Sequence, residues 1–201
     1  NFYTSIQDAI DAARAGEVIE LMDTRIKLDG EIFIDKDITI VGHGEGDTVL
    51  AGANGQRIFT INDNDVSTQI LVGLQGMTLQ GYGNPVSGNG GLVLNSENLV
   101  LNQVSLAKGY ATNGGALYNN GGNVVMVRTT FTDNYASNNG GAVYNAGGGM
   151  LNMSETTLSN NRAGNSGGGL YSASNGIVTI NNSTVDYNYA ASGNGGGIYL
   201  D

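Results

Sequence analysis

Three stretches of the chain repeat one pattern at a nearly constant interval. Residues 130–144 have the sequence TFTDNYASNNGGAVY, residues 157–171 have TLSNNRAGNSGGGLY, and residues 184–199 have TVDYNYAASGNGGGIY. Each stretch joins a Thr-apolar-x-x-Asn segment to a glycine run that ends in an apolar residue and Tyr. The Asn recurs at positions 134, 161 and 188, which are 27 residues apart. A period of this length predicts a solenoid of stacked repeats.

Weaker copies extend the pattern toward the N-terminus. The segment GGALY ends at Tyr118, and GGLVL carries Leu94 in the Tyr position. Between the glycine runs lie short segments rich in Val, Ile, Leu and Thr with alternating apolar residues, and no helical pattern of ten or more residues. We therefore expect an all-β fold, a single-stranded, right-handed parallel β-helix with about 27 residues per rung, the handedness following the general preference of parallel crossovers.

Equivalent residues of successive rungs stack about 4.8 Å apart, so repeated side chains are predicted to form ladders. The Asn residues are predicted to hydrogen-bond through their amides, at a corner where Asn tolerates the left-handed conformation. A second ladder of β-branched residues is expected from the Thr positions, and the glycine pairs are expected to supply positive φ. The predicted ladder residues are Asn134, Asn161, Asn188, Thr130, Thr157 and Thr184.

A column of tyrosines has two interpretations. Tyr118, Tyr144, Tyr171 and Tyr199 recur at intervals of 26, 27 and 28 residues. An aromatic stack stabilises a solenoid by ring contacts. If alternation turns the rings outward, the same column forms a platform that binds sugars or a partner protein. Both interpretations stay open at this point.

The N-terminal residues predict a cap. In residues 5–15, SIQDAIDAARA, apolar residues fall on one helical face, Thr4 or Ser5 can serve as the N-cap, and Gly16 ends the pattern. The expected organisation is a cap helix over residues 1–16 and one β-helix domain over residues 17–201. No cap pattern follows at the other end, so the rung ending at Asp201 is expected to be continued by further chain or covered by a neighbour.

Composition limits the classes of partner. The formal net charge is −10, with eight Lys and Arg, whereas a nucleic-acid footprint is basic. No apolar run approaches the roughly 20 residues of a membrane-spanning helix. The chain opens without a basic segment, so a signal peptide is expected to be removed or not included. The lack of Cys is compatible with an extracellular location, because a long solenoid buries enough surface without disulfides.

Two families share these patterns. The segments GEVIEL at residues 16–21 and DITIVGHGEGDTVLAG at residues 37–52 resemble the opening of pectin-lyase-like β-helix proteins. The motifs GGAL, GGAV, GGGL and GGGI, alternating with FTDN, resemble the Gly-Gly-Ala-Ile and Phe-x-x-Asn repeats of polymorphic outer-membrane proteins over roughly residues 70–201. Only Phe131 supplies the literal Phe; Leu158 and Val185 replace it. This second resemblance implies a β-helix passenger exposed at a cell surface.

An enzyme is the alternative, because pectin-lyase-like β-helices include polysaccharide lyases and glycoside hydrolases. Gly42-His43-Gly44 and Arg25-Ile26-Lys27 resemble short polygalacturonase motifs, but their order is reversed, so His43 is interpreted as a turn residue. Glycoside hydrolysis requires two carboxylates on one face. In the repeat alignment Asp133 matches Asn160, Asp186 matches Ser159 and Glu155 matches Arg128. No stacked acid pair is predicted, and we assign no catalytic residue.

The segment Asn62-Asp63-Asn64-Asp65 is a weak Ca²⁺ candidate, with Asp63 and Asp65 as ligands. It lacks the Gly and distal Glu of an EF-hand loop, so an ordinary solvated turn is favoured, and no other cofactor is expected.

The sequence thus predicts a non-catalytic protein of the cell surface or extracellular space. The expected role is that of an adhesin, a passenger or a structural or filament subunit. Its partner is expected to be a protein or glycan at a cell surface, or further copies of itself.

Overall fold

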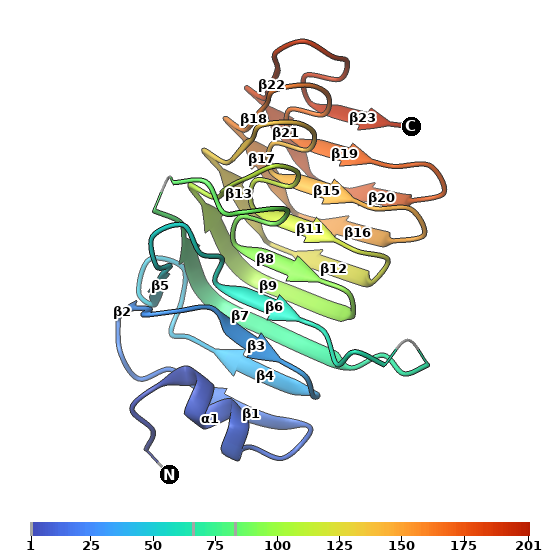
Figure 1. Cartoon of the computed structure of the whole chain (residues 1–201). Coiled ribbons are helices and arrows are strands. Elements are labelled where there is room, and N and C mark those ends of the chain that lie inside the picture. Colours follow the sequence, from blue (N-terminus) through green and yellow to red (C-terminus); the bar gives the residue numbers. More distant parts are fainter. Residues whose placement is uncertain (1, 66, 83) are drawn as a thin grey trace.

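The chain winds into a column of stacked rungs whose strands run parallel to their neighbours (Figure 1). The computed structural model describes residues 2–65, 67–82 and 84–201. Paired residues in successive rungs from residue 98 onward are separated by 25 to 28 positions, as in Tyr110↔Tyr135 and Leu170↔Ile198. The predicted all-β parallel solenoid with about 27 residues per rung is confirmed.

Each regular rung contributes strands to three sheets. Sheet A contains β1 Glu17–Glu20, β4 Ile38–Val41, β7 Leu71–Gln80, β9 Asn98–Ala107, β12 Asn123–Val127, β16 Met150–Ser154 and β20 Ile177–Asn181, with a second part formed by β2 Arg25–Lys27, β5 Val49–Ala51, β13 Thr130–Thr132, β17 Thr157–Ser159 and β21 Thr184–Asp186. Sheet B contains β3 Ile32–Ile34, β6 Phe59–Ile61, β8 Val93–Asn95, β11 Leu117–Asn119, β15 Val143–Asn145, β19 Leu170–Ser172 and β23 Ile198–Leu200. Sheet C contains β10 Tyr110–Ala111, β14 Tyr135–Ala136, β18 Arg162–Ala163 and β22 Tyr189–Ala190.

The core is a column of apolar side chains inside the rungs. Because side chains alternate along a strand, Val124 and Met126 point inward from β12, and Phe131 does so from β13. All three are fully buried. Each such side chain contributes roughly 1.5–3 kcal/mol through burial. Since the next rung covers it, stability depends on stacking.

Single residues with positive φ turn the chain at two corners. The corner between the two parts of sheet A uses Arg128 and Glu155, with φ of 48° and 50°. The corner before sheet C uses Asp133 and Asn160, with φ of 54° and 57°. The expectation that the ladder Asn itself adopts the left-handed conformation is therefore wrong. The preceding residue makes the turn, which leaves the Asn side chain free to point into the rung.

The two glycines of each pair are required for different physical reasons. The first has positive φ, as predicted, for example 67° at Gly140. The second lies against the next rung: a Cβ on Gly141 would lie 2.0 Å from the carbonyl oxygen of Gly168. Only glycine allows the backbones to approach this closely.

The cap helix, α1 Ile6–Ala12, is confirmed but ends three residues earlier than predicted. Ser5 is the N-cap, and its Oγ accepts a hydrogen bond from the Asp8 N–H at 3.1 Å. The side chain of Gln7 accepts from the Phe33 N–H at 2.8 Å and donates to the Phe33 carbonyl at 3.1 Å. Lys36 Nζ donates to the Ile10 carbonyl at 3.2 Å, so a lysine serves the last turn. The helix thereby satisfies the backbone of β3.

Candidate binding surface

The predicted Asn ladder is confirmed. Asn134 Nδ2 donates to Asn161 Oδ1 at 2.9 Å, and Asn161 Nδ2 donates to Asn188 Oδ1 at 3.0 Å. Each amide also donates to a backbone carbonyl, that of Leu106 for Asn134 and that of Phe131 for Asn161. Asn134 and Asn161 are buried. The ladder is an internal polar column with its hydrogen bonds satisfied, so it supports the fold and is not offered to a ligand.

A second Asn ladder escaped the sequence analysis. Asn95 Nδ2 donates to Asn119 Oδ1 at 3.0 Å, Asn119 Nδ2 donates to Asn145 Oδ1 at 2.9 Å, and Asn145 Nδ2 donates to Ser172 Oγ at 3.2 Å. All four residues are buried. Each directly follows the Leu or Tyr of the glycine-run repeat, so a position-by-position alignment contained the signal.

The Thr positions lie on the outer surface. Thr130, Thr157 and Thr184 are paired in register on β13, β17 and β21. Ser105 and Thr78 continue the same column on β9 and β7. The result is a row of exposed or half-exposed hydroxyl residues beside the inward Phe131 column.

The Tyr column on sheet B is a close stack. Ring centroids are separated by 4.9 Å between Tyr118 and Tyr144, 4.9 Å between Tyr144 and Tyr171, and 5.2 Å between Tyr171 and Tyr199. The planes lie within 8°, 13° and 20° of parallel. Burial raises the pKa of Tyr118, Tyr144 and Tyr171. Because each inner ring covers the faces of its neighbours, the column offers ring edges to solvent. This geometry favours the structural interpretation over stacking of sugars on ring faces.

Sheet C carries a second aromatic column that the sequence analysis missed. The rings of Tyr110 and Tyr135 meet edge to face with centroids 4.7 Å apart. The Arg162 guanidinium lies between two rings, 5.8 Å from Tyr135 and 5.6 Å from Tyr189, within the range of cation–π attraction. Arg162 and Tyr189 are exposed. The signal was an x-Ala dipeptide that directly follows each ladder Asn.

The acids of the regular repeats stay in separate columns. The strand register places Asp186 with Ser159 and Thr132, as the alignment predicts. Asp133 and Glu155 occupy the two different left-handed corners.

Outside the regular repeats, one pair of acidic residues lies close together. The Asp63 N–H donates to Glu97 Oε1 at 3.3 Å, and the Ile70 N–H donates to Glu97 Oε2 at 3.2 Å. Glu97 is only 2% exposed. Burial raises the pKa of its carboxyl group, and the negative charge of Asp63 raises it further. The alignment missed this pair because residues 62–70 do not follow the repeat. Glu97 holds both ends of that loop.

The Ca²⁺ candidates use their oxygens within their own loop. Asp63 Oδ1 accepts from the Asp65 N–H at 2.8 Å, and Asp63 Oδ2 accepts from Thr68 Oγ1 at 2.9 Å. Asp65 Oδ1 accepts from the Ser67 N–H and hydroxyl. Within the described residues, no three His, Cys, Asp or Glu side chains gather as metal ligands. The hydrogen bonds describe a solvated Asx-type turn.

The two polygalacturonase-like motifs have different surroundings. Arg25, on β2, donates to Gln80 Oε1 at 3.4 Å. His43 lies in the loop of residues 42–48, where its N–H donates to Thr48 Oγ1 at 2.9 Å. A shallow cleft beside this loop is lined by His43, whereas Arg25 and Lys27 are not among its lining residues.

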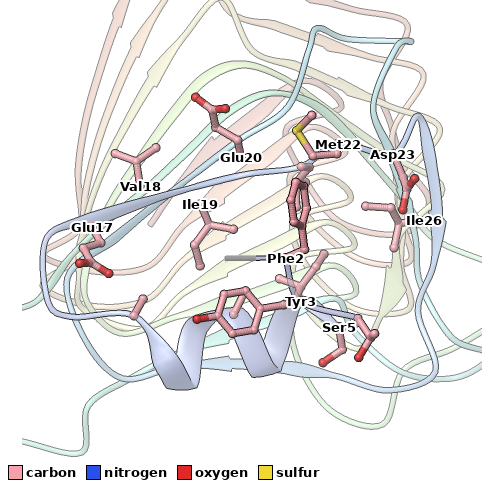
Figure 2. A pocket seen from close by; sticks show the side chains of 15 residues that line it. Phe2, Tyr3, Ser5, Glu17, Val18, Ile19, Glu20, Met22, Asp23 and Ile26 are labelled. Atoms are coloured by element: carbon pink, nitrogen blue, oxygen red, sulfur yellow. The ribbon is translucent and has the colours of Figure 1, made fainter.

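A larger pocket of about 780 Å³ lies at the N-terminal end, between residues 2–6, α1 and β1 (Figure 2). Its apolar side chains include the exposed Phe2, Val18 and Met22, and the carboxylates Glu17, Glu20 and Asp23 also line it. These groups form the open end of the apolar core rather than a convergent set of catalytic groups.

Comparison with known proteins agrees with this architecture. Residues 128–146 and 155–173 match the family model of the Chlamydia polymorphic membrane protein repeat. Each match begins at a left-handed corner residue and includes a ladder Asn and a Tyr of the sheet B column. No curated protein and no solved structure matches the chain. The chain is a parallel β-helix protein, and two of its rungs are similar to the polymorphic membrane protein repeat. In the described part of the chain, no helix has the length and hydropathy needed to cross a membrane.

Proposed function

We propose that this protein is an adhesin-like β-helix, exposed at a cell surface or secreted, that binds a protein or glycan without catalysing a reaction. The surface location rests on the repeat match, because the matched family is named for membrane proteins. The non-catalytic role rests on the separate columns of Asp133, Glu155 and Asp186, which do not form the carboxylate pair that hydrolysis requires.

The observation that carries the binding role is the sheet C column. Tyr110, Tyr135, Arg162 and Tyr189 present rings and a guanidinium along one line of the surface. Exposed aromatic residues and Arg are the side chains that dominate binding energy in interfaces. The rings hold Arg162 in place, so less side-chain entropy is lost on binding. The sheet B Tyr column, by contrast, offers only its ring edges.

A binding measurement with a double variant tests this role. We expect Arg162→Gln combined with Tyr189→Ser to reduce binding of the labelled chain to target cells or to a glycan array at least tenfold. The matched control is Lys108→Asn combined with Tyr187→Asn, which removes one exposed cation and one exposed ring at left-handed corners that Asn tolerates.

Circular dichroism and thermal unfolding should be the same for both double variants. Equal loss of binding in both, or none in either, would contradict the proposed role of the column. A passenger or filament subunit uses the same scaffold without a ligand, so an unaltered signal would favour those architectural roles.

A further inference from the structure

An inserted loop interrupts the regular surface at one corner of sheet A. Later rungs pass this corner with a single residue, such as Gln103 or Arg128. In the earlier rung, residues 42–48 connect β4 to β5. The loop lies against the next rung, because the Gly42 N–H donates to the Gln75 carbonyl and the Gly44 N–H donates to the Gly76 carbonyl, both at 2.8 Å.

The loop is fixed in shape. A Cβ on Gly42 would lie 2.4 Å from the Gly76 carbonyl oxygen, so glycine is needed for the close approach. Thr48 is fully buried and accepts the His43 N–H through Oγ1 at 2.9 Å. The groups that the loop presents are therefore held before any ligand arrives, which lowers the cost of binding.

Between the loop and the following corners lies the cleft introduced above, with a volume of about 480 Å³. Its lining in the described structure consists of glycines and polar side chains: Gly42, His43, Gly44, Glu45, Gln75, Gly76, Gln103 and Arg128. Four residues of the loop and residues of three successive rungs thus line one depression. It is chemically unlike the apolar N-terminal pocket.

The polar side chains of this cleft have unused hydrogen-bonding capacity. Within the described residues, Arg57–Glu31 is the ion pair formed, and Arg128 takes part in none. Arg128 Nη2 donates to Asn102 Oδ1 at 3.1 Å, which leaves the other guanidinium donors available. Burial raises the pKa of Glu45.

We propose that this cleft binds an acidic sugar residue, its carboxylate on Arg128 and its hydroxyls on the amide, imidazole and carboxyl groups of Gln75, Gln103, His43 and Glu45. Arginine matches a carboxylate in geometry and charge. Hydroxyls both donate and accept, so they suit a lining that contains amides and an acid. A bare sulfate would bring only acceptors to Glu45, and an apolar ligand would find no apolar wall in the described lining. The site is separate from the sheet C column and does not depend on its function.

The single His of the chain makes the proposal directly testable. The imidazole signal of His43 is followed by NMR during titration of the whole chain with glucuronate, with glucose and sulfate as comparison probes. We expect a saturable shift with glucuronate and much weaker responses to glucose and sulfate.

Two corner variants separate binding from folding. Arg128→Asn removes the guanidinium while Asn tolerates the φ of 48°, and we expect at least tenfold weaker glucuronate binding. Lys108→Asn makes the same change at a corner with φ of 58° that does not line the cleft, and should bind as the unaltered chain does. An unmoved His43 signal, equal binding by Arg128→Asn, or a response to sulfate or glucose as strong as to glucuronate would overturn the proposal.

Discussion

The regular rungs from residue 98 onward and the irregular rungs before it are built on different stabilising interactions. In the regular part, the same residue type recurs at equivalent positions of adjacent rungs, so that Asn134 contacts Asn161 and Tyr144 contacts Tyr171. In the earlier part, individual pairs of unlike groups connect the elements, such as Gln7 with the Phe33 backbone and Arg57 with Glu31. There the offset between paired strands also changes, from 27 residues to 34 at Ile38↔Val72.

The difference has a physical reason. A side chain stacked on its own copy must be complementary to itself. An Asn amide carries both donors and an acceptor, and an aromatic ring contacts another ring, whereas identical charges repel. Ion pairs therefore need unlike neighbours, which the irregular rungs provide. Irregularity also creates concave surface, because the 42–48 loop leaves a cleft that a uniform column does not have.

Breaking the Asn ladder should have the largest effect. Asn161→Ala leaves the Phe131 carbonyl, the Asn134 N–H and the amides above and below without their partner. With about 1–3 kcal/mol for each buried group left unsatisfied, we expect a loss of about 3–5 kcal/mol in the free energy of unfolding. Denaturant unfolding measures it. The control is Asn160→Gly at an exposed position, which keeps the left-handed corner and should change the free energy of unfolding by under about 0.5 kcal/mol. Similar losses for the two variants would contradict a main contribution of the Asn ladder to stability.

A glycine comparison sharpens the contrast between the two regions. Gly141→Ala places a Cβ 2.0 Å from the Gly168 oxygen in the regular part, and we expect a loss of about 3 kcal/mol. Gly30→Ala in the irregular part meets Gln56 Oε1 at 3.8 Å, so it should be neutral or stabilising by about 0.4–1 kcal/mol. Thermal unfolding of both variants is the measurement. A tolerated Gly141→Ala would mean that the rungs separate easily.

The Tyr column of sheet B allows a similar comparison, in which thermal unfolding measures the stability of two variants. Tyr144→Ala removes a ring packed between two others and should cost about 2 kcal/mol. Phe33→Ala changes a ring in the same outward column of sheet B that is 57% exposed and outside the Tyr stack, and should cost much less.

The stack should also be alkali-sensitive. The pKa of Tyr118, Tyr144 and Tyr171 is raised above 10.0 because burial disfavours the phenolate. Their contribution is fully present below pH 10.0 and is lost as pH rises through the raised values. Absorbance titration of tyrosinate, followed together with circular dichroism, checks this. Ionisation of these three below pH 10.0 would contradict the close stack.

The smallest effect is expected at the boundary between the regions. Glu97→Gln replaces one of two acceptor oxygens by a donor, so the Asp63 or Ile70 N–H loses its partner at a cost of about 1–2 kcal/mol. Hydrogen exchange should accelerate at these two amides while the Asn ladders stay protected. Glu155→Gln, at an exposed corner, is the control and should leave exchange unchanged. Faster exchange throughout the chain would show that the loop and the ladders unfold together.

The predictable part of the fold follows from recurrence. A 27-residue interval between Asn134, Asn161 and Asn188 was enough to place them in one column, and the strand register agrees. The cap helix was predictable from its apolar face, although its end at Ala12 depends on extended backbone at Ala13. The sheet C column was visible only as a short x-Ala dipeptide, because a two-residue strand is too brief to show alternation.

The sequence by itself determined the rung, its ladders and the stacking, because a solenoid turns equal spacing in the chain into contact in space. Only the tertiary structure decided which unlike residues meet. The Asp63 N–H donates to Glu97, and Arg128 lines one cleft together with His43. Such contacts depend on loop lengths and on how far each loop leans over its neighbour, and the repeat carries no information about either. The candidate ligand cleft lies in this part of the molecule.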